Sequence, residues 1–183
     1  MLETTFSPFP ELQTERLILR RLLRSDAPAI LRLRGNEVVM KYIDRDRALT
    51  TEDAFVFIDR IQASLDTDTG ITWAMAFKSA PDELIGTIGF WRMIREHHRA
   101  ELGYMLDPAE WRKGIMKEAI NEVVAKGFSL LQLHSVEARI DPNNTGSALV
   151  LQSTGFVKEA HLKEAFYYNG VFKDTVIYSK LNS

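Results

Sequence analysis

Residues able to hold a phosphate group stand together in the middle of the chain. The segment Trp111-Arg112-Lys113-Gly114 follows a strand-like run that ends at Leu106, and it precedes a stretch with helical periodicity. The start of a helix exposes backbone N–H groups that have no partner inside the helix, and the helix dipole favours an anion there. Arg112 and Lys113 add positive charge, while Gly114 lets a ligand approach the backbone. This spacing predicts a site for a phosphate-bearing ligand.

The two common nucleotide patterns do not match this loop. A triphosphate loop needs two glycines five apart, followed by Lys and by Ser or Thr, whereas Gly114 is preceded by Lys113 and followed by Ile115. The dinucleotide fingerprint needs three glycines at the start of its helix, and only Gly114 is present here. A different phosphate ligand is therefore expected.

Hydrophobic spacing predicts the elements that position the loop. Residues 101–106 predict a strand, and a turn is expected at Asp107-Pro108. After the loop, apolar residues recur at three- and four-residue steps, which predicts a helix that packs against a sheet. The members of that apolar face are Met116, Ala119, Ile120, Val123, Val124, Gly127, Phe128 and Leu131.

The remaining elements follow from capping and turn residues. Ser25 or Asp26 should cap a short helix, Thr50 or Thr51 a second one, and Asn169-Gly170 predicts a β-hairpin turn. The predicted order is one strand, two helices, three strands, helix, strand, helix and two strands. The ranges outside 101–131 are a strand at 16–21, helices through 30–33 and 51–65, a loop at 38–49, strands at 71–78, 84–93 and 130–141, a turn at 79–83, a helix at 147–153, and strands from 155 to 181.

Composition limits the classes of function. The chain has 183 residues, 45% of them hydrophobic and 26% charged, as expected for one domain, 1–183, with a sizeable core. A net charge of −2 and an isoelectric point near 6.1 give no basic surface for nucleic acid. No apolar run approaches the roughly 18 residues of a membrane helix, and no secretion signal is visible, so we expect a cytoplasmic protein without a membrane partner.

Two absences restrict the chemistry further. Cysteine is absent, which excludes an acyl-enzyme thioester on a cysteine and any disulfide. His97 and His98 are adjacent, but no third ligand stands at metal-site spacing and their neighbours are cationic. No metal is therefore expected.

The loop resembles the acyl-coenzyme A loop of the GNAT superfamily of N-acetyltransferases, whose pattern is Gln/Arg-x-x-Gly-x-Gly/Ala. In this chain the pattern stands as Trp111-Arg112-Lys113-Gly114-Ile115-Met116. Trp111 replaces the leading polar residue, as in the branch that includes the ribosomal-protein N-terminal acetyltransferases. Met116 replaces the final small residue, which implies that backbone rather than side chain touches the pyrophosphate there.

Two further segments carry the same resemblance. The opening Thr14-Glu15-Arg16-Leu17, followed by Leu19-Arg20 and Ser25-Asp26-Ala27, resembles the start of the ribosomal-protein branch. Asn144-Thr145-Gly146-Ser147 with Gly155-Phe156 resembles the second GNAT motif. The resemblance covers nearly the whole chain and implies an α/β (α+β) GNAT fold, with a mixed, mostly antiparallel twisted sheet of about seven strands flanked by about four helices.

The resemblance implies direct attack of an amine on the thioester of acetyl-CoA. It implies that the backbone of Met105 and Leu106 and the side chain of Asn144 bond the pantetheine arm, with Ser147 near it. The segment Trp111 to Met116, which comprises Trp111, Arg112, Lys113, Gly114, Ile115 and Met116, would hold the pyrophosphate. Asn144 could equally be a turn residue, and Arg112 and Lys113 could equally be solvated surface charges.

Acid and base roles are also implied by family position. Glu101 stands where several GNAT enzymes carry a catalytic Glu, and its alternative is a solvated strand residue. The usual acid is a Tyr at the position of Leu151, so Ser147 is the substitute, unless it only caps the short helix. Tyr167 and Tyr168 are further sources of a proton, or cleft walls, or plain strand residues.

Three functions remain open from the sequence. The first is acetylation of a protein N-terminal amine, whose pKa near 7.8 makes deprotonation at pH 7 cost only about 1 kcal/mol, against about 4.6 for lysine. The second is acetylation of a small amine such as an aminoglycoside, a polyamine or an amino-sugar, and the third is a catalytically silent acyl-CoA-binding module. Loops at 38–49 and 165–172 should line the acceptor cleft, and a homodimer is left open.

Overall fold

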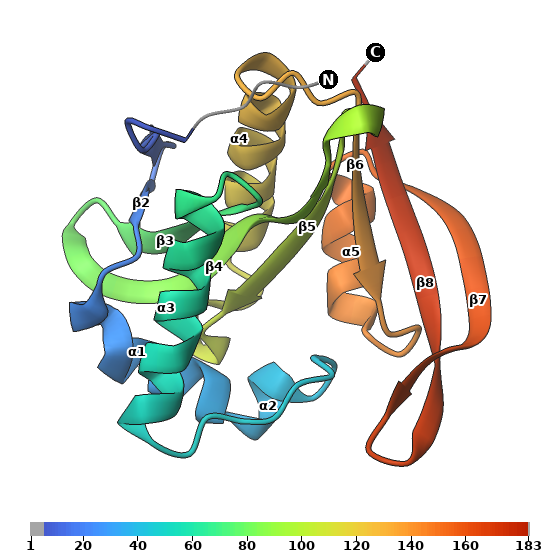
Figure 1. The fold of residues 1–183 in the computed structure, drawn as a ribbon, viewed down its shortest axis with the longest axis horizontal. Helices are drawn as coiled ribbons and strands as arrows, with labels where there is room; N and C mark the ends of the chain where they lie inside the picture. Colours follow the sequence, from blue (N-terminus) through green and yellow to red (C-terminus); the bar gives the residue numbers. More distant parts are fainter. Residues whose placement is uncertain (1–5, 183) are drawn as a thin grey trace.

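A single sheet runs through the computed structural model, which describes residues 6–182. Within these residues the sheet has eight strands in the order β1-β2-β3-β4-β5-β6-β8-β7 (Figure 1). The strands are β1 (Leu12–Gln13), β2 (Leu17–Arg21), β3 (Ile71–Phe77), β4 (Ala80–Ile94), β5 (Arg99–Leu106), β6 (Ser135–Ile140), β7 (Val157–Tyr168) and β8 (Val171–Leu181). Only β5 and β6 pair in parallel among these neighbours, so the predicted mixed, mostly antiparallel sheet is confirmed.

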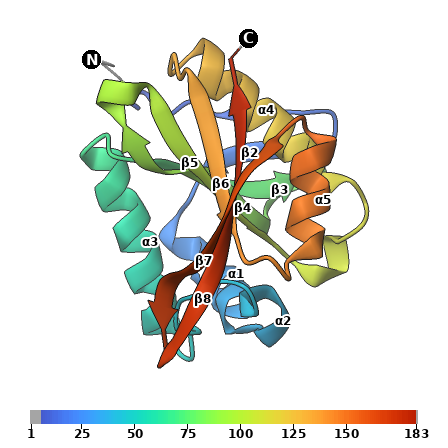
Figure 2. The same cartoon turned by 90° about the vertical axis from the view of Figure 1, so that its right-hand side faces the viewer.

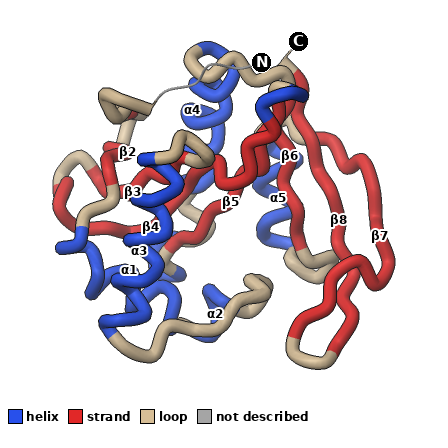
Figure 3. Tube along the Cα trace, in the orientation of Figure 1, coloured by secondary structure: helices blue, strands red, loops and turns tan. Residues whose placement is uncertain are grey.

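Helices cover both faces of the sheet, as Figures 2 and 3 show. Those within the described residues are α1 (Ala27–Gly35), α2 (Glu37–Met40), α3 (Thr51–Asp66), α4 (Ile115–Ser129) and α5 (Thr145–Ser153). One buried cluster lies between the sheet and α4 and α5, and a second lies between the sheet and α1 and α3. This two-sided core fixes β5 and β6 in the middle of the molecule.

The apolar face predicted for α4 is confirmed. Its buried residues are Ile115, Met116, Ala119, Ile120, Val123, Val124 and Gly127. Gly127 has a packing reason to be glycine, because a Cβ there would lie 2.7 Å from Cζ of the buried Phe90. A side chain at this position would push α4 away from the sheet, and the start of the helix would move with it.

Three local features differ from the sequence predictions. The predicted loop at 38–49 begins inside α2, which Asn36 caps by accepting from the backbone N–H groups of Val38 and Val39. The two-residue β1 is too short to leave a periodic signal, which raises the strand count above seven. Asp26 does not cap α1, since its carboxylate instead pairs with Arg20 at 2.7 Å in the interior.

Other capping and turn predictions hold. Thr50 caps α3 with a reciprocal contact to Asp53. Asn169 and Gly170 both have positive φ, at 48° and 80°, as a tight hairpin turn between β7 and β8 requires. The turn between β3 and β4 is shorter than predicted, because β4 already begins at Ala80.

The central feature for function is the separation of β5 from β6. The two strands pair at three positions only, the last of which joins Glu101 to Glu137. Beyond this point β5 continues beside β4 alone, and β6 continues beside β8 alone. The edge of β5 from Leu102 to Leu106 therefore faces a gap in the sheet, with backbone groups that β6 does not pair.

Candidate active site

The loop before α4 has the geometry of an anion site. Gly114 is the residue that precedes the helix, its φ is 76°, and no side chain caps the helix start within the part of the chain described here. Arg112 also has a positive φ of 62°, so the loop turns twice in four residues. The first N–H groups of α4 are left without a partner inside the helix, as a bound phosphate requires.

Trp111 has a structural role that the sequence did not reveal. Its indole Nε1 donates to the carbonyl oxygen of Leu106 at 2.9 Å, which ties the loop to the end of β5. This contact explains an aromatic residue at the first position of the loop. It also occupies one acceptor site of Leu106, whose backbone was predicted to bond the pantetheine arm.

Residues after Gly114 present backbone rather than side chains. Ile115 and Met116 are both buried in the core beneath α4. Because the Met116 side chain points into the core, only its main chain can meet a ligand at the loop. The predicted backbone contact is therefore the one the structure allows.

The two basic side chains of the loop differ. Lys113 donates to Glu110 at 3.2 Å, so part of its charge is already paired. Arg112 is exposed and makes no ion pair or hydrogen bond to the described residues. Arg112 is thus the freer of the two for a phosphate group.

The start of α5 faces the same gap between β5 and β6, as Figure 1 shows. Asn144 caps this helix, since its Oδ1 accepts from the backbone N–H of Ser147 at 3.1 Å. The alternative that Ser147 is the cap is wrong, because the helix begins two residues earlier. Leu151, at the usual position of a tyrosine acid, is fully buried and carries no proton donor.

Tyr104 is a residue of this region that sequence reasoning missed. Its hydroxyl is buried and makes no hydrogen bond of good geometry to the described residues. Burial raises the pKa of Tyr104 to about 12, and the neighbouring Ser147 hydroxyl offsets part of that rise. Two hydroxyl groups therefore meet between β5 and α5.

Glu101 and Glu137 lie side by side where β5 and β6 separate. Both are buried, at 5% and 3% exposure, and they are direct neighbours in the strand register. Arg92 lies 3.3 Å from Glu101, and Arg139 lies 3.7 Å from Glu101 and 3.0 Å from Glu137. Arg99 also pairs with Glu137. The alternative of a solvated strand residue is thus wrong for Glu101.

The Glu101 carboxylate is held by charge, yet it retains bonding capacity. Its Oε2 is buried and forms no hydrogen bond of good geometry within residues 6–182, although Arg92 and Arg139 both pair with this oxygen. Burial raises the pKa of Glu101, while three arginines offset part of that rise. The arginines are Arg92, Arg139 and Arg99. A carboxylate with a raised pKa can accept a proton.

An irregularity in β4 shapes the same place. The register between β4 and β5 shifts between Phe90 and Arg92, so Trp91 bulges out of the ladder. A Cβ on Gly103 would lie 3.2 Å from the Trp91 indole, which means that the ring rests on the glycine. Gly103 is two residues from Glu101 on the same face, so Trp91 walls the space beside the carboxylate.

Segments from opposite ends of the chain line a second hollow of about 310 Å³. Met40, Ile43 and Asp44 come from α2 and the loop after it, and Tyr168 and Lys173 come from the β7–β8 hairpin. Lys173 pairs with Asp44 at 2.5 Å, and the Tyr168 hydroxyl donates to Asp46 at 2.9 Å. The two loops predicted to line an acceptor cleft are thus brought together.

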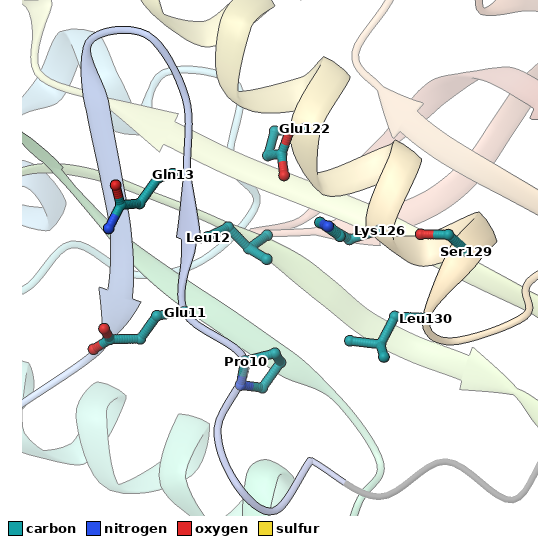
Figure 4. A pocket seen from close by; sticks show the side chains of 8 residues that line it. All are labelled: Pro10, Glu11, Leu12, Gln13, Glu122, Lys126, Ser129 and Leu130. Carbon is teal, nitrogen blue, oxygen red and sulfur yellow. The ribbon is translucent and has the colours of Figure 1, made fainter.

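Another hollow lies away from all these residues. It has a volume of about 510 Å³ and separates the N-terminal segment Pro10–Gln13 from the outer side of α4 (Figure 4). Glu122 and Lys126 line it, well past the first turn of the helix. It is shallow, and neither Glu101 nor Glu137 lines it.

Residues 6–182 contain no group of three acidic, histidine or cysteine side chains placed to hold a metal ion. None of their helices is long and apolar enough to cross a membrane.

Comparison with known proteins identifies the class. Residues 16–157 match the family model described as the acetyltransferase (GNAT) domain, and the chain belongs to this family. It is 39% identical over 171 residues to an uncharacterized N-acetyltransferase, YoaA, of Bacillus subtilis, covering 93% of this chain and 96% of that protein. It is 26% identical to the spermidine N(1)-acetyltransferase of Vibrio cholerae, over 86% and 88% of the two chains. It is 31% identical to the ribosomal-protein-serine acetyltransferase of Escherichia coli, over 58% and 59%.

Solved structures agree with the fold. The ribosomal-protein-S5-alanine acetyltransferase of Vibrio fischeri superposes with a TM-score of 0.83 at 27% identity, over 95% and 97% of the chains. RimL in complex with coenzyme A superposes with a TM-score of 0.85 at 19% identity, over 94% and 98%. The protein is an acetyl-CoA-dependent N-acetyltransferase with the GNAT fold.

Acetyl-CoA fits the residues present. The uncapped helix start at Gly114 suits its diphosphate, and the unpaired edge of β5 suits an extended arm that carries amides. Strand geometry puts Glu101 roughly 17 Å along β5 from Leu106. A ligand that joins an anion at the loop to a reacting centre at Glu101 must therefore be long and extended, as a pantetheine arm is.

Proposed function

We propose that the acceptor is a protein N-terminal α-amine and that Glu101 removes its proton. The observation that carries this proposal is the charge around Glu101, where three arginines surround two carboxylates. A polyamine would bring further positive charges against Arg92, Arg99 and Arg139. A single α-amine brings one charge, which it loses at a cost of only about 1 kcal/mol at pH 7.

Each residue at the gap receives a role in this proposal. Bound acetyl-CoA supplies an acetyl thioester that is open to attack by an amine. Gly114, Ile115 and Met116 bind its diphosphate through backbone N–H groups, with Arg112 beside them. Met105 and Asn144 form hydrogen bonds to the pantetheine arm from the two sides of the gap. Leu106 adds the backbone hydrogen-bonding capacity that its contact with Trp111 leaves free.

Proton transfers divide between the two faces of the sheet. Glu101 accepts a proton from the attacking amine at its carboxylate, whose raised pKa suits this role. Ser147 passes a proton to the departing sulfur on the α5 side and takes one in return from the Tyr104 hydroxyl. The two groups stand on opposite sides of the gap, so neither has to serve both steps.

Residues 1–183 form one domain with one active site in this proposal. The sheet supports this, because strands from both ends of the chain, β1 and β8, belong to it. The proposal needs no second copy of the chain, since every group named comes from one chain. A ribosomal-protein acceptor would place the reaction in the cytoplasm.

A small amine is the second candidate, because the Vibrio cholerae relative of 26% identity is a spermidine acetyltransferase. The test is thiol release from acetyl-CoA, measured with free N-terminal peptides, with the same peptides blocked at the terminus but carrying a lysine, and with spermidine and an aminoglycoside. We expect the free-terminus peptides to have the highest kcat/KM. Faster turnover of spermidine or the aminoglycoside would establish the second candidate, and binding of acetyl-CoA without thiol release from any acceptor would contradict both.

A further inference from the structure

A cluster outside the reacting centre joins the turn between β1 and β2 to the start of α4. Thr14 donates its hydroxyl to Glu118 Oε1 at 2.5 Å. The Arg16 backbone N–H donates to the same oxygen at 2.8 Å, and its Nε donates to Oε2 at 2.7 Å. The other arm of the Arg16 guanidinium donates to the carbonyl oxygen of Lys113 at 2.9 Å. The β1–β2 turn is thus bonded both to the first turn of α4, through Glu118, and to the loop before it, through Lys113.

The contact with Lys113 sets the direction of the next N–H. In a planar trans peptide the C=O and the following N–H point in opposite directions. Because Arg16 holds the Lys113 carbonyl on its own side, the Gly114 N–H must point to the other side of the loop. The guanidinium also lies close to Gly114 itself, since a Cβ on Gly114 would be 3.5 Å from the Arg16 Nη2.

Charge gives the cluster a second effect. Glu118 lies in the first turn of α4, where its carboxylate would repel a phosphate bound at the same helix start. Partial burial raises the pKa of Glu118, but the hydrogen bonds from Thr14 and Arg16 outweigh that and lower it, so the carboxylate stays ionised. Arg16 places its charge between this carboxylate and the loop, which offsets the repulsion.

We propose that Arg16, oriented by Thr14 and Glu118, is a positioning residue that holds the Lys113–Gly114 peptide ready for the diphosphate of acetyl-CoA. The inference rests on the proposed placement of the diphosphate at Trp111 to Met116. It gives the opening Thr14-Glu15-Arg16-Leu17, which has no part in the reacting centre, a role at the cofactor.

Calorimetry with coenzyme A tests the inference without knowledge of the acceptor. Arg16→Gln should raise the Kd for coenzyme A about tenfold, as expected for loss of charge-assisted hydrogen bonds. Thr14→Val, which removes only one hydroxyl, should raise it two- to threefold and serves if Arg16→Gln fails to fold. Arg24→Gln is the matched control, because it breaks an exposed arginine–carboxylate pair, with Asp59, that lies away from the loop.

Two further measurements distinguish a role of Arg16 in positioning the loop from a purely structural link between the β1–β2 turn and α4. Hydrogen exchange of the free Arg16→Gln variant should speed up at residues 112–116 and stay unchanged in the middle of α4. In turnover assays the KM for acetyl-CoA should rise while kcat is kept. A lower melting temperature with unchanged Kd and unchanged exchange at 112–116 would overturn the inference.

Gly114→Ala distinguishes failure of the inference from failure of the proposed site. Alanine at a φ of 76° is strained, so this variant should also bind coenzyme A more weakly if the diphosphate lies there. Weaker binding by Gly114→Ala but not by Arg16→Gln overturns only the role of Arg16. Wild-type affinity in both variants shows that the diphosphate binds elsewhere, and both proposals then fail.

Discussion

The loop between β5 and α4 and the tip of the β7–β8 hairpin are both exposed, yet they are held in different ways. Trp111 ties the loop to β5, and Arg16 bonds the loop carbonyl at Lys113. The hairpin tip exposes Tyr167 and Phe172 at 60% and 62%, with their rings 4.8 Å apart, and it is joined to the α2 loop by two side-chain contacts.

The difference teaches which part of the molecule is suited to a constant ligand. A loop whose peptide planes are fixed by internal hydrogen bonds binds one anion in one geometry. An exposed aromatic hairpin held by surface contacts can adapt to different partners at little cost in stability. The loop before α4, here called the cofactor side, and the β7–β8 hairpin tip with the α2 loop, here called the acceptor side, should therefore respond differently to mutation.

The largest effect is expected at Glu101, between the two sides. Glu101→Gln removes the base and should lower kcat/KM about 100-fold or more, with the KM for acetyl-CoA unchanged. Because burial raises the folded-state pKa of this carboxyl, its ionisation costs the folded protein stability as pH rises through that pKa. At neutral pH the free energy of unfolding of the variant should therefore be no lower than that of the wild type. Thiol release and chemical denaturation measure the two quantities, and retained activity would remove Glu101 as the base.

The next largest effect is expected in the pH dependence of kcat/KM when the neighbouring carboxylate, Glu137, is replaced. Glu137→Gln removes a negative charge beside Glu101 and frees Arg139 and Arg99 to interact with it. Both changes lower the pKa of Glu101, so the acid limb of kcat/KM should move to lower pH by up to about one unit, equivalent to about 1.4 kcal/mol. An acid limb that stays in place would show that Glu137 does not influence the base, and one that moves to higher pH would contradict the expected direction.

The cofactor side is probed at Trp111. Trp111→Phe keeps an aromatic ring but removes the hydrogen bond to Leu106, which should raise the KM for acetyl-CoA about fivefold, as for loss of about 1 kcal/mol. The KM for the acceptor should not change. Trp91→Phe is the variant to compare with it. Because Trp91 rests on Gly103 beside Glu101, this substitution should alter the KM for the acceptor and leave that for acetyl-CoA unchanged. Equal effects of both variants on both substrates would break the division between the two sides.

The smallest effect is expected at the acceptor side. Lys173→Met removes the contact with Asp44 and should change the acceptor KM two- to threefold, because partly exposed ion pairs contribute at most about 1 kcal/mol. The KM for acetyl-CoA and the melting temperature should stay as in the wild type. Lys158→Met, an exposed lysine on β7, is the control. A larger change in the acetyl-CoA KM than in the acceptor KM would show that the hairpin acts on the cofactor.

Much of the fold was predictable from local signals. The apolar period of α4, the Thr50 cap and the Asn169-Gly170 turn each depend on residues within a few positions of one another. The gap between β5 and β6 was not predictable from such signals, because it depends on where a parallel pairing stops. Nothing in the sequence around Glu101 marks that point.

The candidate site divides in the same way. The sequence by itself determined the helix start at Gly114, the acidic residue at Glu101 and the family, since residue types and spacing carry that information. Only the tertiary structure decided that Glu101 is buried beside Glu137 and three arginines, that Tyr104 meets Ser147, and that Arg16 bonds the loop at Lys113. The physical reason is distance along the chain: backbone geometry is set by near neighbours, whereas burial, charge and hydrogen bonding at a site come from segments that meet only after folding.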